Sequence, residues 1–149
     1  MKHMNKEELK SYGDTLPLGS TYDAHGKVLT YKDSDGYWYE FTRDAQSNVL
    51  TLKNSAGDWS EYTYDAHGQV LSYKDSDGYW SEYTRDAQSN VLTYKDSDGY
   101  WSEYTRDAQS NVLTYKNSDG DWRGFSNDET DKERARLKQV RKQLKRSIK

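Results

Sequence analysis

A period of 21 residues dominates the sequence and restricts the folds that the chain can adopt. Five aligned segments begin at Thr21, Thr42, Thr63, Thr84 and Thr105, and the fifth ends at Phe125. Trp and Lys recur in two fixed columns, which are Trp38, Trp59, Trp80, Trp101, Trp122 and Lys32, Lys53, Lys74, Lys95, Lys116. A fixed period is the signature of a repeat architecture, in which each unit is stabilised by its neighbours. The third and fourth units are nearly identical, which indicates recent duplication or consensus design.

The composition is low in hydrophobic residues and high in aromatic residues. Hydrophobic residues make up 32% of the chain and charged residues another 32%, a balance that is typical of disorder. Aromatic residues make up 14%, with fourteen Tyr and five Trp, which is far too many for a solvated tail. We therefore expect aromatic columns to replace a conventional apolar core.

Each unit contains two turn signals about ten residues apart, separated by β-formers. In the third unit the turns are residues 65–68 and 75–78, both of which begin with Asp and end with Gly. The intervening residues 70–74 and 79–84 are rich in β-branched and aromatic types, which favour strands. No apolar spacing of 3.6 residues supports a helical solenoid. The sequence predicts a mostly β fold, an antiparallel β-meander of five two-strand units that is either open or curled.

The odd period restricts the strand register. Identical side chains keep the same face in every unit only if one loop of each unit is odd and the other even. A three-residue turn with Gly78 in the left-handed conformation places Lys74 opposite Trp80. This register puts Leu71, Tyr73, Tyr79, Tyr83 and Arg85 on one face and Val70, Ser72, Lys74, Trp80, Glu82 and Thr84 on the other. A two-residue loop at residues 77–78 is the alternative, and it would group Trp80 with Leu71 and Tyr73.

The repeat resembles the RHS or YD repeat family, whose signature is Tyr-Asp, two residues, Gly and an apolar residue. Residues 61–78 carry this pattern, and the resemblance covers residues 21–125. It implies a long β-sheet strip, which in that family curls into shells around toxin segments. Two departures occur in the same units, where Arg43, Arg85 and Arg106 replace Tyr and Ser47, Ser89 and Ser110 replace Gly. Five units are too few to enclose a protein, and the resemblance carries over no catalytic residues.

The C-terminal segment, residues 126–149, differs in charge from the rest of the chain. Residues 128–149 hold nine bases and four acids, a net charge of +5, whereas residues 1–127 carry −8. Capping-box spacing at Ser126 and Glu129 and a stripe of Leu137, Val140, Leu144 and Ile148 predict a basic amphipathic α-helix. It could cap the sheet, pair with its own copy, or present basic residues to nucleic acid or an anionic membrane. The candidate basic surface is Arg134, Lys138, Arg141, Lys142 and Lys145.

The N-terminal segment, residues 1–20, is predicted to be a cap or edge segment. Residues 5–12 have the pattern of a short helix, and residues 16–18 are expected to enter the sheet as an edge strand, where Pro is tolerated. Met1 to Asp14 is charged rather than signal-like, and no apolar run approaches the roughly 20 residues that cross a bilayer. This predicts a cytoplasmic protein, with secretion by a non-signal route left open.

No combination of residues predicts a catalytic or metal site. His25 and His67 occupy equivalent turn positions, where other units have Gln, and His3 lies near the terminus. The Asp-Ser-Asp-Gly turns suggest calcium, but their Gly falls at position four rather than six of an EF-hand loop. There is no Cys to form a disulfide or bind a metal. We expect no cofactor and no enzymatic activity.

The leading functional hypothesis is a repeat-sheet protein that binds a macromolecular partner, with a protein partner favoured. One version is a small bacterial or phage inhibitor or immunity factor whose carboxylates engage a basic target. The candidate binding residues are Tyr79, Trp80, Glu82, Tyr100, Trp101 and Glu103. A carbohydrate-binding or adhesion module is the first alternative, and a structural protein that self-assembles through its sheet edges is the second.

Overall fold

The structure, a computed structural model, describes residues 3–124, 136, 138–140, 142 and 143. Its contacts divide the chain into two units, Met1–Trp101 and Ser102–Lys149. In each unit, strands that are adjacent in the sequence are adjacent in an antiparallel sheet. The mostly β fold and the meander topology predicted from the sequence are therefore confirmed.

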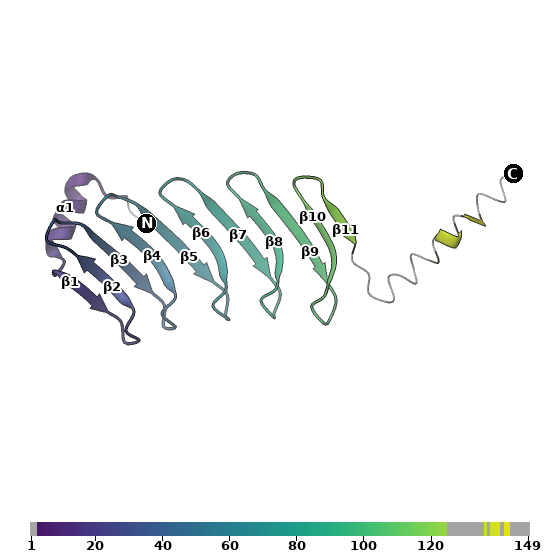
Figure 1. The fold of residues 1–149 in the computed structure, drawn as a ribbon, viewed down its shortest axis with the longest axis horizontal. Coiled ribbons are helices and arrows are strands. Elements are labelled where there is room, and N and C mark those ends of the chain that lie inside the picture. The colour runs from purple at the N-terminus through teal and green to yellow at the C-terminus, as the bar shows by residue number, and fades with distance from the viewer. Residues whose placement is uncertain (1–2, 125–135, 137, 141, 144–149) are drawn as a thin grey trace. The chain divides into compact units, whose positions relative to one another are not determined.

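The first unit combines one helix with a sheet whose order is linear, so the sheet is open and β1 is its edge strand (Figure 1). Its elements are α1 (Lys6–Thr15), β1 (Gly19–Tyr22), β2 (Val28–Lys32), β3 (Trp38–Arg43), β4 (Val49–Asn54), β5 (Trp59–Tyr64), β6 (Val70–Asp75), β7 (Trp80–Arg85) and β8 (Val91–Asp96).

The second unit begins within β9 (Trp101–Arg106) and continues with β10 (Val112–Asn117) and β11 (Trp122–Gly124). The six described residues of the predicted C-terminal helix, 136, 138–140, 142 and 143, are helical and exposed. Leu137, Leu144 and Ile148 of its apolar stripe lie outside the described residues. The three interpretations of this helix stay predictions.

Helix α1 confirms the short N-terminal helix predicted from the sequence. Its N-cap is Asn5, whose side chain accepts a hydrogen bond from the Glu8 backbone while the Glu8 side chain accepts one from the Asn5 backbone. The helix ends at Thr15, and its C-cap Leu16 takes the extended conformation that a following proline favours. The predicted edge strand at residues 16–18 is wrong, because Leu16 caps the helix and the strand begins only at Gly19.

The turn before each tryptophan fixes the strand register. In the third unit Gly78 has a φ of 87°, in the left-handed region, and its N–H donates to the Asp75 carbonyl at 3.2 Å. The Asp75 side chain accepts hydrogen bonds from the backbones of Asp77 and Tyr79. Lys74 consequently lies opposite Trp80, which confirms the favoured register and excludes the two-residue loop.

The turn before each valine explains both departures from the RHS or YD signature. Ser89 replaces Gly and keeps the left-handed conformation, with a φ of 65°, and its hydroxyl lies 2.8 Å from Nδ1 of His67 in the preceding repeat. Arg85 replaces Tyr, and its Nε donates to the carbonyl of Val70 fifteen residues earlier, at 3.1 Å. Tyr64 makes the equivalent bond through its hydroxyl, to Val49 at 2.7 Å. The two residue types therefore join neighbouring hairpins in the same way.

One side of the sheet, called here the tyrosine face, is covered by pairs of aromatic rings from neighbouring strands. Tyr62 and Tyr73 lie 5.0 Å apart between ring centroids, and Tyr83 and Tyr94 lie 4.9 Å apart. Ser81 lies opposite Tyr73 on this face and is only 5% exposed. The small serine allows the neighbouring rings to cover the backbone, so that a single layer shields its own hydrogen bonds.

The opposite side, called the tryptophan face, carries the Trp, Lys and Glu columns with a row of paired hydroxyls, such as Thr84 and Thr93 at 2.7 Å. Helix α1 packs on this face at the first repeat. Trp38 is 1% exposed and Leu9 is 8% exposed, and these are the only buried hydrophobic side chains among the described residues. Gly13 sits directly on the Trp38 ring, since a Cβ built there would lie 2.3 Å from Nε1.

We predict that Gly13→Ala lowers the free energy of unfolding, by up to about 2 kcal/mol, in urea denaturation. Overpacking against a buried ring costs about 1–3 kcal/mol, which outweighs the gain of about 1 kcal/mol in helix propensity. Ser11→Ala is the control, because Ser11 is exposed on the same helix and should lose nothing. A Gly13→Ala protein as stable as the parent would contradict the contact between Gly13 and Trp38.

Candidate functional site

The tryptophan face repeats one arrangement of charges and rings. Each glutamate on it forms an ion pair with the lysine of the next strand. The distance from the lysine Nζ to the carboxylate oxygen is 2.6 Å for Lys74 and Glu61 and 2.7 Å for Lys95 and Glu82. The Lys95 Nζ also lies 5.7 Å from the centroid of the Trp80 ring. Lys95 of β8 thus contacts both a carboxylate and an aromatic ring of the neighbouring strand β7.

The ion pairs differ in exposure along the first unit. The side chains of Lys53 and Glu40, beside α1, are 23% and 17% exposed, whereas those of Lys95 and Glu82 are 59% and 53% exposed. Trp80 follows the same trend, with 38% of its surface exposed against 1% for Trp38. The same residue types are therefore buried at one end of the unit and available at the other.

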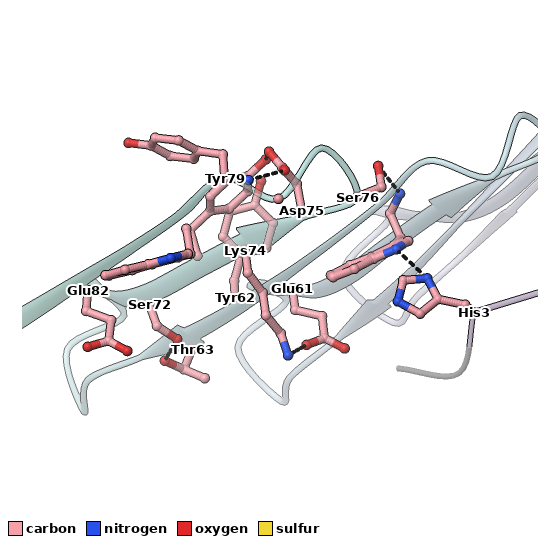
Figure 2. Close-up of a pocket in the computed structure, with 14 residues that line it drawn as sticks. His3, Glu61, Tyr62, Thr63, Ser72, Lys74, Asp75, Ser76, Tyr79 and Glu82 are labelled. Atoms are coloured by element: carbon pink, nitrogen blue, oxygen red, sulfur yellow. Dashed lines mark hydrogen bonds and ion pairs between the residues drawn. The ribbon is translucent and has the colours of Figure 1, made fainter. Parts of the chain in front are cut away.

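A groove of about 810 Å³ has Trp59 and Trp80 of the tryptophan face among the residues that line it. Figure 2 shows the groove, with Lys74, Glu61 and Glu82 labelled. Lys74 and Glu61 lie inside it and are joined by their ion pair. The hydrogen bond from Lys74 lowers the pKa of Glu61. The groove therefore offers an apolar wall of indole rings with charged groups between them, an arrangement suited to binding a chain with both apolar and polar side chains.

Residues at the N-terminus complete the covered end of this face. His3 lies against Trp59, with ring centroids 5.3 Å apart, and accepts a hydrogen bond from the Trp59 indole at 3.2 Å. The Tyr12 hydroxyl donates to the Glu40 carboxylate, and Nζ of Lys53 lies 3.9 Å from the centroid of the Tyr12 ring. Burial raises the pKa of Tyr12 to about 12, and the hydrogen bond to Glu40 adds in the same direction.

The six binding candidates chosen from the sequence divide between the two faces. Trp80 and Glu82 lie on the tryptophan face with Lys74 and Lys95. Tyr79 belongs to the tyrosine face, where its hydroxyl lies 3.1 Å from that of Tyr94.

Tyr100 also packs on Tyr94, with ring centroids 5.9 Å apart. Trp101 is 39% exposed at the start of β9, and Glu103 pairs with Lys116 at 2.7 Å in the second unit. The candidates chosen from the sequence do not include Lys74 and Lys95, although the predicted register already placed Lys74 opposite Trp80.

The predicted basic helix surface is described only at Lys138 and Lys142, which are helical and exposed. Arg134, Arg141 and Lys145 lie outside the described residues. Among the residues that the structure describes, no helix is long and apolar enough to cross a membrane.

The histidines and turn carboxylates have structural partners. His25 and His67 contact Ser47 and Ser89 of the following repeats, both at 2.8 Å. The hydrogen bond from Ser89 of the next repeat, together with backbone hydrogen bonds from Gln69 and His67 in its own turn, lowers the pKa of Asp65. Within the described part of the chain, no three His, Asp or Glu side chains are grouped closely enough to hold a metal ion.

Comparison with known proteins yields likenesses to solved structures only. No family model and no curated protein matches the chain. It is similar to a chain of the Tc holotoxin pore of Photorhabdus luminescens, with 16% identity over 66% of this chain and 6% of that chain and a TM-score of 0.49.

A second similar chain belongs to the crystal structure of TcdB2-TccC3, with 23% identity over 66% of this chain and 5% of that chain and a TM-score of 0.49. In the form without the hypervariable C-terminal region, the identity is 20% over 79% of this chain and 6% of that chain, with a TM-score of 0.48. The chain therefore spans about a twentieth of the length of these proteins. The repeat β-sheet that the RHS or YD resemblance implies is present in this chain, as its own strand pairing shows.

We predict that the stability of the protein falls as the pH rises from 10 toward 12, and that Tyr12→Phe makes this fall shallower. The folded state holds the Tyr12 proton up to about pH 12, whereas the unfolded chain releases it near 10.0. The stabilisation is thus complete below pH 10 and is lost above it. Part of the pH dependence of stability should remain in the Tyr12→Phe protein, because the pKa of Tyr73 is also raised to about 12.

Urea denaturation at a series of pH values measures these slopes. Tyr22→Phe is the control, because Tyr22 is 58% exposed on the edge strand. Equal slopes for the parent and the Tyr12→Phe protein would contradict the half-buried hydrogen bond between Tyr12 and Glu40.

Proposed function

We propose that this chain is a non-enzymatic binding protein that engages a protein partner through the exposed part of its tryptophan face. The observation that carries the proposal is the position of Trp80, which is 38% exposed beside a groove of about 810 Å³. Tryptophan is among the residue types that contribute most to binding when they are desolvated at an interface. A tryptophan with no role in binding is usually more deeply covered.

The charged groups beside Trp80 favour a protein over an apolar small molecule. Glu82 and Lys95 pair with each other while each keeps more than half of its surface exposed. Such groups can exchange partners at the rim of an interface, where they steer association and fix orientation. The net charge of −8 over residues 1–127 favours a basic partner, as the inhibitor or immunity version of the function requires.

We predict that Trp80→Ala reduces capture of the partner by at least tenfold. The test is affinity purification from cells of the native host, with crosslinking and mass spectrometry, followed by titration of the purified partner. Replacement of an interface tryptophan costs about 2 kcal/mol or more, which exceeds the roughly 1.4 kcal/mol of a tenfold change. Binding should also weaken with added salt, because exposed charges are screened.

Gln88→Ala is the matched control, since Gln88 is exposed in the turn that follows β7, the strand that carries Trp80. Partner binding that is equal in the two variants would overturn the proposal. Binding to a glycan array that depends on Trp80, with no protein captured, would instead support the carbohydrate-binding alternative.

A further inference from the structure

The residues that hold α1 recur on the sheet 42 positions later. The helix contacts Lys32, Trp38, Glu40, Lys53 and Gly57. The corresponding residues two repeats further are Lys74, Trp80, Glu82, Lys95 and Gly99. All five types are identical at both places, and both sets belong to the first unit. We call the first set the α1 seat and the second set the second seat.

Strand pairing gives the two seats the same geometry. Lys32 lies opposite Trp38 in the α1 seat, as Lys74 lies opposite Trp80 in the second. Glu40 lies opposite Lys53, as Glu82 lies opposite Lys95.

The glycines Gly57 and Gly99 also share the left-handed conformation, with φ of 96° and 86°. A Cβ on Gly57 would lie 3.5 Å from the Leu9 side chain of α1, and one on Gly99 would meet nothing within 4 Å. The second seat therefore has the backbone shape of the first, with open space where the leucine of α1 lies.

The interactions of α1 define what such a seat recognises. Leu9 is buried against the turn, Tyr12 donates to Glu40 and receives Lys53 on its ring, and Gly13 lies on the indole. Lys32 completes the contact, because its Nζ donates to the Gly13 carbonyl at 2.8 Å near the C-terminal end of the helix. The seat thus selects an amphipathic helix with Leu, then Tyr three residues later, then Gly.

Two lysines are placed differently in the two seats. Lys32 donates to the Gly13 carbonyl of α1, whereas Lys74 is ion-paired with Glu61 at 2.6 Å. Lys53 lies over the Tyr12 ring of the bound helix, whereas Lys95 lies over the indole of its own Trp80. Docking of a helix would move Lys95 from Trp80 to the incoming tyrosine while its ion pair with Glu82 is kept. The cation–π contact is then exchanged rather than lost.

The spacing of the two seats leaves room for a second helix. Four strand spacings of about 4.8 Å separate Trp38 from Trp80, a distance of roughly 19 Å, and a helix with its side chains is about 10–12 Å wide. The intermediate seat, one repeat closer, is already engaged, since Lys53 contacts Tyr12 and Trp59 contacts His3.

We propose that the second seat docks an amphipathic α-helix of the partner protein, and that this helix presents the same Leu, Tyr and Gly arrangement as α1. The inference rests on the proposed function, because it names the structural class of the partner. Identical recognition residues, identical pairing and open space together carry it.

A synthetic peptide of residues 3–18 tests the inference as a probe for the second seat. The labelled peptide is titrated with the full chain, and binding is followed by fluorescence anisotropy. We expect saturable binding that Trp80→Ala weakens at least tenfold. The same loss should follow from Lys95→Glu, which removes the cation without changing the tryptophan, and circular dichroism verifies the fold of both variants.

Changes within the peptide separate specific docking from helix formation. Ala is a better helix former than Gly, yet the Gly13→Ala peptide should bind at least tenfold more weakly, because its Cβ would strike the indole. The Ser11→Ala peptide is the matched control and should bind as well as the parent peptide.

The outcomes distinguish failure of the helix inference from failure of the proposed function. A peptide that fails to bind, or that binds equally to the Trp80→Ala and Lys95→Glu proteins, overturns the helix inference. If capture of the host partner still depends on Trp80, the proposed function survives that failure. If neither the peptide nor any partner depends on Trp80, both claims fail.

Discussion

Contacts between side chains on neighbouring strands are the interactions on which this structure depends, because no second layer of the described residues packs along the sheet to form a core. Only Leu9 and Trp38 are buried hydrophobic side chains in the described residues, so area burial in a central core cannot provide the main stabilisation. Cross-strand pairs supply it instead, through aromatic contacts on one face and ion pairs with hydroxyl pairs on the other. Because each such pair contributes little, stability has to come from their repetition.

Repetition also explains why different residues can occupy the same structural position. The bond from one hairpin to the preceding hairpin is made by a guanidinium at Arg85 and by a phenol at Tyr64, since both reach a backbone carbonyl fifteen residues earlier. A serine at position 89 adopts the left-handed conformation that glycine adopts at position 68, and its hydroxyl bonds to the preceding turn. The hydrogen bonds of Ser89 offset the conformational cost that a side chain incurs there. What the repeat specifies is therefore a backbone path and a contact, which more than one side chain can satisfy.

The sequence was sufficient to predict the features that follow from periodicity. The meander, the register with Lys74 opposite Trp80 and the separation of tyrosines from Lys–Glu pairs all follow from a 21-residue period and the parity of the loops. Contacts made outside the repeat could not be predicted in this way. Nothing periodic indicates that Gly13 lies on Trp38, and residues 16–18 looked like a strand because a proline is tolerated at a sheet edge. The favoured register, by contrast, already placed Tyr79 and Trp80 on opposite faces, so the six binding candidates could not form one site.

The covered and exposed ends of the tryptophan face show how one column of side chains can serve both stability and binding. Trp38 and Trp80 occupy equivalent positions, yet α1 removes one from solvent and leaves the other 38% exposed. A helix bound in the same chain needs no second molecule, so its docking costs no translational entropy and can be held by few contacts. An equivalent helix from a partner has to meet that cost and gains from the same contacts only what α1 gains. Binding at one seat should therefore be weak and reversible, and strong binding would require a partner that also contacts residues beyond the seat.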